Sequence, residues 1–105
     1  MKYDKIVKLT SKVSYPAFRT DMNSDIGEWL TNTLTETFGV KPVLKRTSGG
    51  SVPISPFVNI LDIPAVGVPT VNKDNNQHSP NENIKIINYI MGIEAFVGIL
   101  SSEFN

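Results

Sequence analysis

Cysteine is absent from this chain of 105 residues. Without it the chain can form neither disulfides nor thiolate metal ligands, and it has no cysteine nucleophile. Basic residues are not in excess either, because ten lysines and arginines balance ten acidic residues without a basic cluster. The positive surface that neutralises phosphates is therefore missing, and we expect no nucleic-acid partner.

Long apolar runs are also missing. No stretch approaches the roughly 20 apolar residues that span a bilayer. Charged residues interrupt the N-terminal sequence MKYDKIVKLTSKV too often for a secretory signal. We therefore expect a cytoplasmic protein with no membrane contact. The length and the hydrophobic content of 40% are typical of one small folding unit.

An alternating pattern predicts a β-strand near the N-terminus. From Tyr3 to Tyr15 the side chains alternate with a period of two, which is typical of a strand with one face in water, and Pro16 ends the pattern. No second alternating strand follows, so we expect the open edge to pair with a second copy of the chain. The residues that the second copy would cover are Val7, Leu9, Val13 and Tyr15.

Three helices and two further strands are predicted after Pro16. Apolar residues at helical spacing predict a helix over 26–38 that ends at Gly39, and a short helix is expected from Ser55 to about Asp62. Strands are expected at 43–47 and 65–71. The last predicted helix, 86–100, has a stripe that we expect to face the core: Ile86, Tyr89, Ile90, Ile93, Phe96, Val97 and Leu100. This order predicts an α/β fold with a mostly parallel sheet and helices on its faces.

Two loops hold the candidate site residues. Gly49, Gly50 and Ser51 follow one predicted strand, and His78, the only histidine, follows the next. The carboxyl ends of neighbouring parallel strands lie at one rim, so we expect both loops to face one cleft. The Gly-Gly-Ser loop could bind a carboxylate or phosphate, or be a plain turn. His78 could be a metal ligand, a general base or an ordinary surface imidazole. A Ser51–His78 catalytic pair is also possible, although the sequence lacks the Gly-x-Ser-x-Gly elbow.

The sequence KRTSGGSVPISPFVNILDIPAVGVP, followed by HSPNE, resembles the C-terminal part of the M20 family of zinc metallopeptidases. This family includes dipeptidases, carboxypeptidases and deacylases, and the similarity covers about residues 15–100. It implies two zinc ions in the cleft of an α/β catalytic domain that carries an inserted lid domain. His78 matches the family's last metal ligand. Gly49, Gly50 and Ser51 match the loop that contacts the substrate near its carboxylate, and Arg46 lies close to an arginine often found before that loop.

The resemblance also implies a division of the chain. Residues 1–18 correspond to the last strand of the lid, often used for dimerisation, and to the crossover, whereas residues 19–105 correspond to the C-terminal part of the catalytic domain. The family's other metal ligands and its catalytic glutamate come from an N-terminal segment, and this sequence has neither His-x-Asp nor Glu-Glu. We therefore assign no catalytic residue and expect the isolated chain to be inactive, without tightly bound zinc.

The expected function is thus a contribution to a dinuclear zinc peptidase or amidohydrolase that acts on a peptide or an N-acyl amino acid. One alternative is a non-catalytic, self-associating interaction module. Another is an anion-binding module that uses the glycine loop without a metal.

Overall fold

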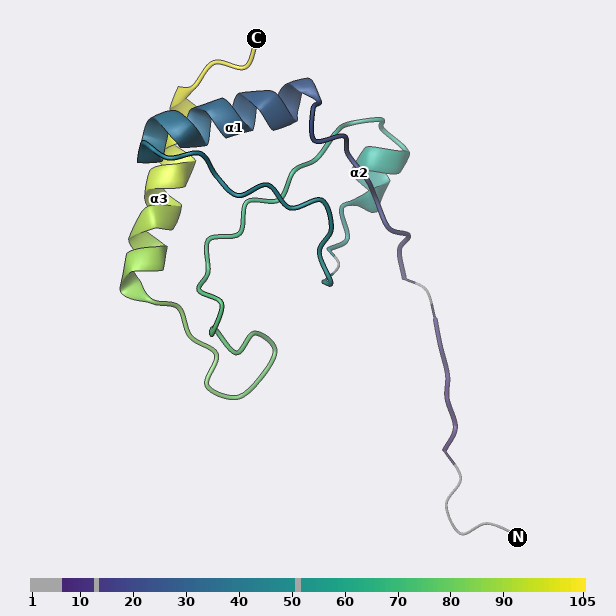
Figure 1. Cartoon of the computed structure of the whole chain (residues 1–105). Helices are drawn as coiled ribbons and strands as arrows, with labels where there is room; N and C mark the ends of the chain where they lie inside the picture. The colour runs from purple at the N-terminus through teal and green to yellow at the C-terminus, as the bar shows by residue number, and fades with distance from the viewer. Residues whose placement is uncertain (1–6, 13, 51) are drawn as a thin grey trace, which may run out of the picture.

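The computed structural model describes residues 7–12, 14–50 and 52–105. Its helices are α1 (Asp25–Phe38), α2 (Ser55–Asn59) and α3 (Ile86–Ser101), as Figure 1 shows. No β-strand occurs in the described part of the chain. The prediction of an α/β fold with a parallel sheet is therefore wrong, while the three predicted helices are present. No helix among the described residues is long and apolar enough to span a membrane.

The segments predicted as strands lack the backbone pairing that defines a sheet. In residues 65–71 the Ala65 N–H donates to a side chain, Thr20 Oγ1, at 3.0 Å, and not to a neighbouring backbone. Pro69 has no N–H to donate. An apolar segment becomes a strand only when a neighbouring strand bonds its N–H and C=O groups, and none of the described segments does so.

In residues 7–12 the predicted N-terminal strand is an arm without regular secondary structure. Residues 7–12 run away from the helices (Figure 1), and Val7 and Leu9 are 89% and 88% exposed. Val13 lies outside the described residues. The expected pairing of this segment with a second copy stays a prediction.

Local signals explain the bounds of α1. Ser24, which is extended, precedes the helix, and its hydroxyl donates to the Asp21 carbonyl at 2.6 Å. Asp25 and Glu28 lie in the first turn, where negative charge favours the helix dipole. Gly39 ends the helix with φ of 70° and donates its N–H to the Thr35 carbonyl. A left-handed C-terminal residue of this kind is usually glycine because it has no Cβ.

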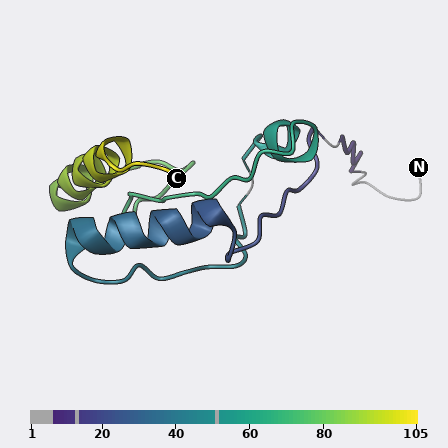
Figure 2. The same ribbon diagram turned by 90° about the horizontal axis from the view of Figure 1, so that it is seen from above.

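The small core lies where α1 crosses α3 (Figures 1 and 2). Leu30 and Leu34 of α1 and Ala95 of α3 are buried, and Val68 packs against them. Two glycines of α3 allow close approach: a Cβ on Gly98 would overlap Thr37 Oγ1, and one on Gly92 would lie 3.3 Å from Thr70 Cβ. Val68 and Thr70 thus lie against the helix crossing, just before the loop that follows.

The C-terminal residues close over one end of this core. The Trp29 Nε1–H donates to the Glu103 carbonyl at 2.8 Å. The Trp29 and Phe104 rings meet edge to face with their centroids 5.3 Å apart. The chain after α3 is therefore held against α1.

Most apolar side chains nevertheless remain exposed. The radius of gyration is 18.7 Å, whereas a compact domain of this length has one of about 13 Å. The apolar stripe of α3, expected to face the core, is 45% to 83% exposed. That expectation is wrong because α1 packs on the opposite, small-residue side of α3, and no other described segment covers the stripe.

Candidate functional site

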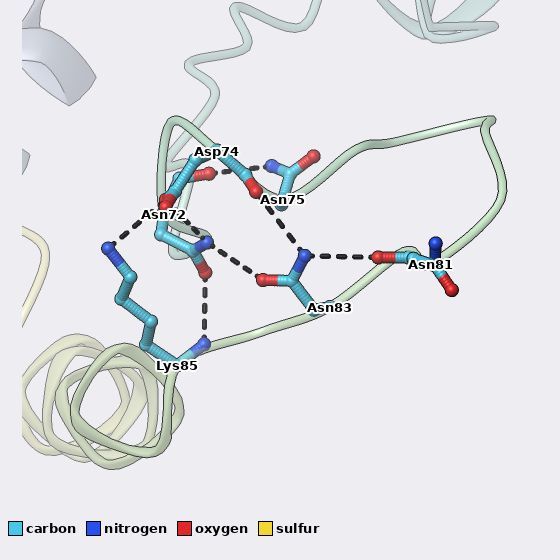
Figure 3. Close-up of polar contacts among 6 residues, drawn as sticks. All are labelled: Asn72, Asp74, Asn75, Asn81, Asn83 and Lys85. Atoms are coloured by element: carbon cyan, nitrogen blue, oxygen red, sulfur yellow. Dashed lines mark hydrogen bonds and ion pairs between the residues drawn. The ribbon is translucent and has the colours of Figure 1, made fainter.

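The loop that carries His78 is held together by one buried amide. We call residues 72–85, which lead into α3, the His78 loop. Asn72 is 6% exposed. Its Nδ2 donates to Asp74 Oδ1 at 2.8 Å and to Asn83 Oδ1 at 3.2 Å, and its Oδ1 accepts the Lys85 N–H at 3.0 Å (Figure 3). A single side chain thus joins both ends of the loop, which fixes its closed shape.

A second set of bonds braces the interior of the loop. Asn83 Nδ2 donates to the carbonyls of Asp74 and Asn81 at 3.3 and 3.1 Å (Figure 3). The Asn83 N–H donates to the Asn75 carbonyl at 2.9 Å. Asn75 Nδ2 donates to the Asn72 carbonyl at 2.8 Å. Asparagine side chains therefore bond backbone groups that no strand satisfies, as they do in many turns.

Asp74 supplies the charge of this network. Its Oδ1 lies 3.1 Å from Lys85 Nζ. The hydrogen bond from Asn72, followed by the one from Lys85, lowers the pKa of Asp74 below its ordinary value. Asp74 is thus a carboxylate at neutral pH. Because both partners are largely exposed, water and salt screen the ion pair.

His78 lies in the outer part of this loop in a left-handed backbone conformation. Its φ is 63°, and Asn76 and Asn81 are also left-handed, with φ of 53° and 61°. Asparagine, aspartate and histidine adopt this region more often than other residues with a side chain do. The His78 side chain is exposed and makes no hydrogen bond or ion pair with any described residue. The loop therefore presents an imidazole that has no structural partner among the described residues.

A hollow of about 360 Å³ lies against the same loop. Its lining combines apolar and polar side chains: Val71, Asn75, Gln77, Glu82, Asn83 and Ile84. Neither His78 nor the glycine loop belongs to this lining. No group of three potential metal ligands comes together among the described residues.

The other predicted site residues lie in a separate exposed segment. A Cβ placed on Gly49 would have no neighbouring atom within 4 Å, so the backbone there is open to a ligand. The Gly50 N–H donates weakly to Ser48 Oγ at 3.4 Å, and Arg46 is exposed. Ser51 lies outside the described residues. No hydrogen bond or ion pair joins Arg46, Gly49 or Gly50 to the His78 loop, so the shared cleft stays a prediction.

The asparagine network is the feature that the sequence analysis missed. Its signal is composition, because five of the twelve residues from 72 to 83 are asparagine. Asparagine favours both left-handed positions and side-chain bonds to nearby backbone. Such a density predicts a loop braced by its own side chains, although not which groups pair.

Comparisons with protein-family models, with curated proteins and with solved structures found no match to this chain. The geometry of the His78 loop is therefore the observation that bears on function. It describes a helical chain in which a braced polar loop presents one imidazole without a hydrogen-bond or ion-pair partner among the described residues.

Proposed function

We propose that this chain supplies part of a dinuclear zinc site in a peptidase or amidohydrolase, with His78 as one metal ligand. The observation that carries the proposal is the construction of the His78 loop. Its network holds His78 at φ of 63° and leaves the imidazole without a described partner. A metal ligand needs an available ring nitrogen, and neutral imidazole is a common ligand of zinc.

The carboxylates near His78 differ in their availability. Asp74 is engaged by Asn72 and Lys85, so we do not assign it to the metal. Glu82 is exposed beside the hollow but is not drawn toward His78 by any described contact. One imidazole cannot hold zinc alone, because catalytic sites use three protein ligands. The remaining ligands and the general base must therefore come from polypeptide outside these 105 residues.

When bound in such a site, zinc would polarise the scissile carbonyl and lower the pKa of a bound water. The residues of this chain would position the reactants. The open backbone at Gly49 and Gly50 admits close approach of a substrate. Arg46 offers a guanidinium that can bind a carboxylate with two hydrogen bonds. We infer a peptide or an N-acyl amino acid as substrate, and a cytoplasmic location.

A second candidate function is a non-catalytic interaction module. It is favoured by the amount of apolar surface, since seven side chains on one face of α3 are 45% to 83% exposed. Under this proposal His78 is an ordinary surface residue and the glycine loop is a plain turn.

Activity measurements on two preparations distinguish these functions. One is the recombinant chain alone, and the other is the tagged chain recovered with its partners from the cells that produce it. Each is assayed with zinc for hydrolysis of a dipeptide and of an N-acetyl amino acid. We expect turnover only in the recovered assembly, reduced at least about 100-fold by His78→Ala. Gln77→Ala, which changes a neighbouring exposed side chain, is the matched control.

Two outcomes would contradict the peptidase proposal. The first is hydrolysis by the recovered assembly that His78→Ala leaves unchanged. The second is turnover by the recombinant chain alone that His78→Ala abolishes, since this chain would then hold the whole site.

A further inference from the structure

We draw no further inference here: the strongest candidate, the hollow of about 360 Å³ against the His78 loop, belongs to the site already described, and nothing in the structure shows what it binds.

Discussion

Replacing Asn72 by alanine should release the His78 loop. The substitution removes three hydrogen bonds: two donated by Nδ2, to Asp74 and Asn83, and one accepted from the Lys85 N–H. Each such bond contributes about 0.5–1.5 kcal/mol net, so the free energy of opening the loop should fall by about 2–4 kcal/mol. Because Asn72 is 6% exposed, water replaces these bonds poorly in the closed loop.

Hydrogen exchange measured by NMR can follow the opening of the loop at two backbone amides. The Lys85 N–H bonds to Asn72 Oδ1, and the Asn83 N–H bonds to the Asn75 carbonyl. In Asn72→Ala both amides should exchange about 30- to 1,000-fold faster, or at the rate of a free amide if that limit is reached first. Gln77→Ala is the control, because the exposed Gln77 side chain makes no hydrogen bond with a described residue. Amides in the middle of α3 should be unaffected in both variants.

Asn72→Asp sharpens the same test. Aspartate keeps the shape and the acceptor for the Lys85 N–H, but it loses both donors and adds a second negative charge beside Asp74. We therefore expect it to open the loop as well. Unchanged protection of Lys85 in Asn72→Ala would refute the claim that this amide closes the loop.

Two further predictions concern charge and packing. Since the folded state lowers the pKa of Asp74, its stabilisation of the loop is present above the ordinary aspartate value of 3.8 and is lost as the pH falls through the lower folded pKa. After correction for intrinsic exchange, the protection of the Asn83 backbone amide should thus be constant at pH values above 3.8 and should decrease at lower pH. In Asp74→Asn the protection should no longer depend on pH in this way. Gly98→Ala should destabilise the helix crossing by about 1–3 kcal/mol through overlap with Thr37, offset in part by a helix-propensity gain of up to about 1 kcal/mol. In chemical denaturation, adding Thr37→Ala to Gly98→Ala should restore part of the lost free energy of unfolding. A Gly98→Ala variant more stable than the native chain would contradict the described packing.

The helices could be read from the sequence because their hydrogen bonds are local. The spacing of apolar residues and Gly39 predicted the C-terminal end of α1, and the structure places it there. The strands could not be read in this way, because a strand exists only with a partner that supplies its hydrogen bonds. Residues 65–71 have the apolar composition of a covered strand but no such partner among the described residues.

The apolar pattern of α3 was informative in a different sense. It predicted a buried Ile93 face, whereas that face is exposed in the structure, because a pattern does not say which surface provides the cover. The candidate site was also only partly predictable. The sequence singles out His78 because it is the one histidine of the chain. The role of Asn72 depends on hydrogen bonds between residues up to 13 positions apart, which a sequence pattern does not show.

The central claim, that His78 is a metal ligand, can be tested directly because the chain has one histidine. The tagged chain is labelled with ¹⁵N-histidine, recovered with its partners, and its zinc is exchanged for ¹¹³Cd. We predict a scalar coupling between ¹¹³Cd and one imidazole nitrogen of His78 in the NMR spectrum, lost in His78→Ala. Stoichiometric cadmium in the assembly without any coupling to this imidazole would contradict the account.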